Sequence, residues 1–99
     1  MARIEFARKA AGDIKRIFDY LAQHNSYSAS ARIQEILQSI TLLEHNPMIG
    51  RMVKNGKREL VVGRGQHAIW SYIVTHRYAP EIGTVFVLAI RGQRELRYT

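Results

Sequence analysis

The sequence predicts a small α+β protein in which a helical hairpin packs on one face of a mostly antiparallel sheet. Apolar residues recur every three or four positions through the first half of the 99-residue chain, which is typical of amphipathic helices. The second half contains three β-rich runs separated by turn residues. With 46% hydrophobic residues, a chain of this length can form one core, so we expect a single domain over residues 1–99.

The first half predicts a strand followed by two helices. Arg3 to Phe6 alternates polar and apolar residues, as a short strand does. From Lys9 the period changes, and one helical face carries Ala10, Ile14, Ile17, Phe18 and Leu21. Residues 23–28 favour a turn, after which a second apolar stripe comprises Ala29, Ile33, Ile36, Leu37, Ile40 and Leu43. This pattern stops at Pro47, because the residue before a proline disfavours helix.

The second half predicts an antiparallel meander. After a loop from Pro47 to Gly56, we expect strands at residues 58–62, 68–75 and 85–90. Residues 63–66 suit a tight hairpin turn, and residues 77–83, which include Pro80, suit a longer loop. The predicted order is therefore β-α-α-β-β-β.

The run 85–90 is apolar throughout, as expected of a central strand that is covered on both faces. Two helices packed on one face of the sheet cannot also cover the other face of this strand. We therefore expect a further covering element, which is either the C-terminal segment or a bound partner.

The net charge of +7 is concentrated in the second half of the chain. Up to Gly50 there are six basic and five acidic residues, and after it nine basic and three acidic residues. This excess favours encounters with nucleic acid, ribosomes or an acidic protein. The N-terminal residues are charged where a secretory signal needs an apolar run, and no uncharged stretch approaches the roughly 18 residues of a membrane span. We expect a cytoplasmic protein that does not bind membranes.

Several kinds of functional site are excluded by the sequence. With no cysteine, the chain has no disulfide, thiolate metal site or cysteine nucleophile. The glycine-rich residues 63–68 lie between two predicted strands, so no helix N-terminus is there to hold a dinucleotide. Residues 50–57 lack the spacing and the hydroxyl of a phosphate-binding loop, and the four histidines lack metal-binding spacing. We expect no metal and no cofactor.

A set of arginines remains, accompanied by His67 and Tyr98: Arg58, Arg64, Arg91, Arg94 and Arg97. Arginine binds phosphates well, and on a nuclease it can stabilise the charge that develops at the scissile phosphate while histidine or tyrosine moves protons. No clear general base accompanies the set. The residues alone leave both a basic binding surface and a catalytic site open.

Three strings resemble the RelE/ParE superfamily of bacterial toxins. They are Asn46-Pro47-x-x-Gly50-Arg51, Gly56-Lys57-Arg58-Glu59-Leu60-Val61-Val62 and Trp70-Ser71-Tyr72-Ile73-Val74. The resemblance covers nearly the whole chain and includes Asp13-Ile14 in the first helix. It implies the toxin of a type II toxin–antitoxin system, which is either a RelE-like ribosome-dependent mRNA endonuclease or a ParE-like inhibitor of DNA gyrase.

The neutral Ala68-Ile69-Trp70 favours the ParE-like branch, because RelE-like nucleases have an arginine shortly before the corresponding tyrosine. The resemblance then implies a gyrase inhibitor that acts by binding, and the target-binding residues would be Arg58, Arg91, Arg94 and Tyr98. A cognate antitoxin would neutralise it in a heteromeric complex by covering the hairpin at Ile14, Phe18, Ile33 and Ile40.

The string Arg91-Gly92-Gln93-Arg94-Glu95 is similar instead to the Gly-x-Arg-Glu string of RelE-like proteins. Under that alternative, the protein acts on the ribosome and mRNA, and its catalytic residues are Arg58, Arg94, His67 and Tyr98. Whether the protein is an enzyme therefore stays open at this point.

Overall fold

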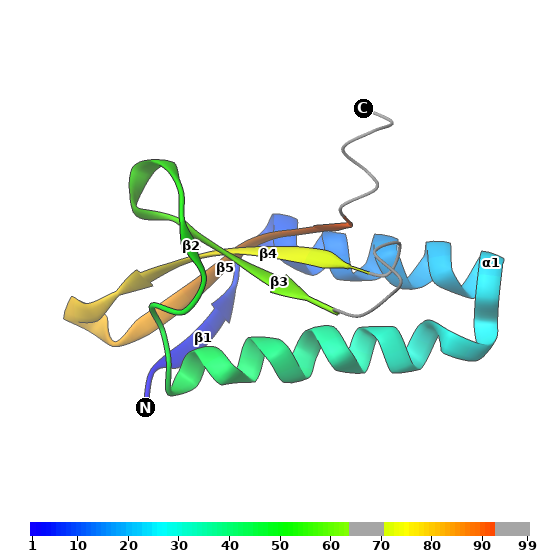
Figure 1. Ribbon diagram of the computed structural model, residues 1–99, viewed down its shortest axis with the longest axis horizontal. Helices are drawn as coiled ribbons and strands as arrows, with labels where there is room; N and C mark the ends of the chain where they lie inside the picture. Colours follow the sequence, from blue (N-terminus) through cyan, green and yellow to red (C-terminus); the bar gives the residue numbers. More distant parts are fainter. Residues whose placement is uncertain (64–70, 93–99) are drawn as a thin grey trace.

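Figure 1 shows the computed structural model, which describes residues 1–63 and 71–92, with the backbone alone for residues 25–28. The described residues form one five-stranded sheet, and a long helix, α1 (Arg8–Thr41), packs on one face of it. The strand order is β1 (Arg3–Phe6), β5 (Thr84–Gly92), β4 (Tyr72–Ala79), β3 (Arg58–Val62) and β2 (Arg51–Met52). The predicted α+β class is confirmed. The predicted turn at 63–66 lies almost entirely outside the described residues, as does the start of the strand predicted at 68–75.

Four strands make antiparallel pairs and the fifth is parallel. β2 (Arg51–Met52), β3 (Arg58–Val62), β4 (Tyr72–Ala79) and β5 (Thr84–Gly92) follow one another as neighbours in the sheet. β1 (Arg3–Phe6) pairs in parallel with β5, with Ile4 opposite Val85. β5 therefore lies between two strands, as its apolar sequence predicts.

The helix α1 (Arg8–Thr41) contains both predicted helices. A straight helix of 34 residues would be about 51 Å long, at about 1.5 Å per residue, whereas the molecule measures 42 Å along its longest axis. Figure 1 shows that α1 bends back on itself into two antiparallel arms. The hairpin is confirmed, but the expected loop at 23–28 has helical backbone, since this segment contains no glycine or proline to interrupt it. A 3₁₀ turn, η1 (Leu42–Glu44), follows the second arm.

The predicted long loop at 77–83 is wrong. β4 continues through Ala79, which pairs with Thr84, and the connection to β5 is the short turn η4 (Pro80–Ile82) followed by Gly83. The prediction also missed β2, because two residues are too few to show an alternating pattern. β2 and the turn η2 (Lys54–Gly56) both lie within the predicted loop 47–56.

The core lies between α1 and the inner face of the sheet, which is the face that α1 covers. It includes Leu21, Ile36, Ile40, Val74 and Val87. On the outer face, Glu59 and Arg91 lie on the same side of the sheet as the exposed Val61 and the buried Ile73. None of the described helices combines the length and the apolar character needed to cross a membrane.

Candidate functional site

The loop before β2 approaches β3 so closely that a glycine is required. Gly50 has a φ of +105°, and a Cβ atom on it would lie 2.6 Å from the carbonyl oxygen of Glu59. Any side chain would combine a steric clash with a backbone conformation that L-residues rarely adopt. The Asn-Pro-x-x-Gly-Arg string therefore has a structural role at its glycine.

Arg58 and His76 hold the same loop from the inner face. Arg58 Nη1 donates to the Gly50 carbonyl oxygen at 3.2 Å, and His76 Nε2 bonds the Ile49 carbonyl oxygen at 3.0 Å. Because a carbonyl accepts only, Nε2 carries the proton. The two residues are cross-strand partners, with Arg58 on β3 opposite His76 on β4.

His76 is fully buried and neutral. Burial lowers the pKa of His76 below its ordinary value of 6.5; the hydrogen bond to Ile49 opposes this shift, and the charge of Arg58 adds to it. Its Nδ1 atom is buried and has no hydrogen-bond partner among residues 1–63 and 71–92. A second proton on this ring would therefore be costly, which excludes His76 as a proton carrier for an external substrate.

An ion-pair network of three residues crosses the outer face of the sheet. Glu59 on β3 accepts from Arg51 at 2.9 Å through one carboxylate oxygen and from Arg91 at 3.1 Å through the other. The hydrogen bonds from Arg51 and then Arg91 lower the pKa of Glu59 below 4.5, against the opposing effect of burial. The carboxylate therefore stays charged and fixes the Arg91 guanidinium at the end of β5.

Arg58 and Arg91 lie on opposite faces of the sheet. Arg58 and Glu59 are consecutive in β3, so their side chains point to opposite faces, and Arg91 bonds Glu59. The other predicted residues, Arg94, Tyr98 and His67, lie outside the described residues. Of the predicted target-binding set, the structure thus describes two members and separates them, and the roles of all four stay predictions.

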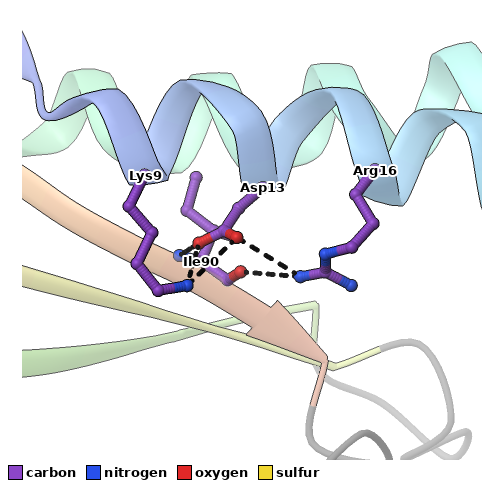
Figure 2. A network of polar contacts seen from close by, with 4 residues as sticks. All are labelled: Lys9, Asp13, Arg16 and Ile90. Carbon is purple, nitrogen blue, oxygen red and sulfur yellow. Dashed lines mark hydrogen bonds and ion pairs between the residues drawn. The ribbon is translucent and has the colours of Figure 1, made fainter.

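A buried carboxylate anchors α1 to β5 (Figure 2). Asp13 is 6% exposed, and its Oδ2 accepts from the backbone nitrogen of Ile90 at 2.9 Å. Lys9 lies 3.3 Å from Asp13, and Arg16 Nη2 donates to the Ile90 carbonyl oxygen at 3.4 Å. β1 ends opposite Val87, so within the described part of the chain no strand pairs with Ile90 on this side, and the helix supplies the partners instead.

The predicted antitoxin-binding residues on α1 differ in exposure. Phe18 is 39% exposed, whereas Ile14 and Ile33 are partly buried against the core and Ile40 is 2% exposed within it. In this conformation a partner can contact Phe18 but not Ile40. Tyr20 and Leu37 add exposed apolar surface on the same helix.

Sequence reasoning assigned no site role to Asp13, Glu59 or His76. Glu59 carried a usable signal, since it is the one acidic residue between Glu44 and Glu81 in a strongly basic stretch. His76 lies between the predicted strand 68–75 and the wrongly predicted loop 77–83, so its burial on a strand was not foreseen. Among residues 1–63 and 71–92, no three acidic or histidine side chains gather as a metal site.

The family model described as "ParE toxin of type II toxin-antitoxin system, parDE" matches residues 4–97. The chain belongs to the ParE toxin family. It is therefore a toxin of a type II toxin–antitoxin system, and the predicted membership of the RelE/ParE superfamily is confirmed.

Solved structures share the fold. A chain of the chromosomal ParDE system of P. aeruginosa is 23% identical, with a TM-score of 0.76 and coverage of 93% of this chain and 96% of that one. A chain of the RelBE2 toxin–antitoxin complex of Mycobacterium tuberculosis is 17% identical, with a TM-score of 0.54 and coverage of 93% and 98%. A metal-bound toxin from Helicobacter pylori is 14% identical, with a TM-score of 0.53 and coverage of 97% and 99%. No curated protein sequence matches this chain.

Proposed function

We propose that this ParE-family toxin inhibits DNA gyrase by binding, without a cofactor and without cutting RNA, and that it acts in the cytoplasm. The observation that carries the proposal is the environment of Arg58. Among the described residues, Arg58 is the one that both hypotheses, gyrase binding and mRNA cleavage, assign to the site. Arg58 bonds the Gly50 carbonyl, and the adjacent histidine, His76, is buried, neutral and bonded to backbone. A phosphate-cleaving site needs a proton carrier within reach of substrate, and His76, the histidine beside Arg58, is not one. The proton carriers that the nuclease alternative requires, His67 and Tyr98, lie outside the described residues.

Arg91 supports a binding surface on the outer face. Its guanidinium is held by Glu59 and is 30% exposed, so it has lost conformational freedom before any partner arrives. Gly92 ends β5 directly after it, and the sequence continues to Arg94 and Tyr98. We assign gyrase contact to Arg91, Arg94 and Tyr98, and we give Arg58 a supporting role in the loop beneath.

The partner that neutralises the toxin is a cognate antitoxin. The P. aeruginosa ParDE system and the M. tuberculosis RelBE2 complex both pair a toxin with an antitoxin, which supports the same pairing here. We place the antitoxin segment over α1, where Phe18, Tyr20 and Leu37 are exposed. An amphipathic segment would bury these side chains, and acidic residues within it would offset the toxin's charge.

The test is gyrase-catalysed supercoiling of relaxed plasmid with increasing amounts of purified toxin. We expect inhibition that is removed when the antitoxin is added in equal amount. Arg91→Gln should weaken inhibition, while Lys15→Gln, at an exposed position of α1, should not. If supercoiling proceeds undisturbed while the same protein stops cell growth, the gyrase proposal fails and ribosome-dependent mRNA cleavage becomes the next assay.

A further inference from the structure

The hairpin between β2 and β3 carries the densest positive charge among the described residues. Residues 51–58 contain four basic side chains and no acidic one: Arg51, Lys54, Lys57 and Arg58. In Figure 1 this green hairpin projects away from the rest of the sheet. Its position at the edge leaves the turn exposed, with Lys54, Asn55 and Gly56 all on the surface.

The hairpin turn is held in one shape by backbone contacts. The Val53 amide donates to the Lys57 carbonyl at 2.9 Å, and the Lys57 amide donates to the Lys54 carbonyl at 3.3 Å. Asn55 has a φ of 64°, which closes the turn. The turn that carries the exposed Lys54 and the partly buried Lys57 therefore has a defined backbone shape.

Arg77 adds a fifth positive charge to this turn from β4. Its Nη2 donates to the Asn55 carbonyl oxygen at 2.9 Å, and the residue is exposed. Since β4 lies inside the sheet, this bond ties the projecting turn to the rigid centre of the molecule. The charge of Arg77 is thus positioned beside Lys54 and Lys57.

The nearest acidic residue in the sequence does not neutralise the turn. Glu59 uses one carboxylate oxygen for Arg51 and the other for Arg91. Arg51 is 78% exposed despite this bond, so it still presents positive charge to solvent. Fixed positive groups on a projecting edge match a regularly charged polyanion better than they match a single small anion.

We propose that the β2–β3 hairpin, with Lys54, Lys57 and Arg77 at its turn, binds the phosphate backbone of duplex DNA. This inference rests on the proposed function, because it gives a gyrase inhibitor a direct hold on the DNA that gyrase engages. Lysines and a fixed arginine neutralise phosphates without reading bases, so the contact is independent of sequence and weakens with salt.

The test measures binding of the full-length toxin to a fluorescently labelled duplex between about 50 and 200 mM salt. Two double variants are compared. The hairpin variant carries Lys54→Gln and Lys57→Gln, and the matched α1 variant carries Arg8→Gln and Lys15→Gln, which remove the same charge from α1. Each phosphate contact contributes about 0.9 to the slope of log affinity against log salt. We expect the hairpin variant to reduce that slope by about 1.8 and to bind DNA several-fold more weakly, while the α1 variant keeps the wild-type slope.

Equal losses in both double variants would overturn the inference, because net charge alone would then explain DNA binding. It is also overturned if the hairpin variant binds DNA normally but binds the antitoxin weakly, since the hairpin would then serve an acidic protein. Supercoiling inhibition by the wild-type toxin is measured in parallel. If the toxin binds DNA through the hairpin but does not inhibit gyrase, only the proposed function fails. If the wild-type toxin inhibits gyrase but the hairpin variant binds DNA as well as the wild type does, only the hairpin inference fails.

Discussion

The two faces of the sheet use polar residues in different ways. On the inner face, Asp13, Arg58 and His76 bond backbone atoms: the Ile90 amide and the carbonyls of Gly50 and Ile49. On the outer face, Glu59 joins the side chains of Arg51 and Arg91, and Arg77 bonds the Asn55 carbonyl of the hairpin turn. The Ile90 amide is buried and must be paired, whereas the partly exposed ion pairs of Glu59 contribute little to stability. The inner groups therefore hold the fold, and the outer groups are available to a partner.

Gly50 lies where the two sets meet, so its replacement should have the largest effect. Gly50→Ala brings a Cβ atom to 2.6 Å from the Glu59 carbonyl oxygen at a φ of +105°. We expect a loss of about 2 to 4 kcal/mol in the free energy of unfolding, measured by urea denaturation. Gly12→Ala is the control: its Cβ would meet nothing within 4 Å, and a helical alanine should stabilise by up to about 1 kcal/mol. Similar values for the two variants would show that the loop adapts.

Asp13→Ala should have the next largest effect, because it leaves the buried Ile90 amide without its acceptor. We expect a loss of about 1 to 3 kcal/mol in the free energy of unfolding. Asp19→Ala removes a carboxylate from the exposed pair with Lys15 and should cost less than about 0.5 kcal/mol. The contrast between buried and exposed contacts breaks down if the two substitutions cost the same.

The pH dependence of stability should separate His76 from Glu59. His76 has a lowered pKa, so the unfolded chain binds the proton more readily, and stability falls as pH drops below 6.5. Glu59 also has a lowered pKa, and the stability it contributes is complete above 4.5 and is lost as pH falls through its folded value.

Urea denaturation of His76→Gln at pH 7.5, 6.5 and 5.5 should therefore show a weaker pH dependence than the wild type. His45→Gln changes an exposed histidine and serves as the control. An unchanged pH dependence in His76→Gln would mean that His76 takes up a proton in the folded state without cost.

Arg91→Gln should have the smallest effect on stability and a large effect on function. The Arg91–Glu59 pair is partly exposed, so we expect a loss below about 1 kcal/mol in the free energy of unfolding. If Arg91 contacts gyrase, about tenfold more toxin should be needed for the same inhibition, corresponding to about 1.4 kcal/mol of binding energy. Arg58→Gln is predicted to show the reverse balance, with the larger loss in stability. A large loss of stability in Arg91→Gln would remove the functional distinction between the faces.

The sequence by itself determined much of this protein. The apolar periods predicted both arms of α1, the strands β1 and β3 and the order of elements, because core positions must be apolar at the spacing of each element. The strings around Gly50, Arg58 and Tyr72 identified the superfamily. These features are local, so they can be read without knowing which segments meet.

The tertiary structure alone decided which face each functional residue occupies. β5 is apolar from Val85 to Ile90, so its sequence shows no alternation from which to assign faces. In the pairing with β4, Thr75 lies opposite Ala89 but His76 lies opposite Val87, which leaves one extra residue in β5. Without this extra residue, Arg91 would share the inward face of Val85 and Val87. With the extra residue in place, Ile90 is buried and Arg91 faces outward to Glu59. One inserted residue reverses every side chain beyond it, and such a shift depends on the neighbouring strand and not on the sequence of β5 itself.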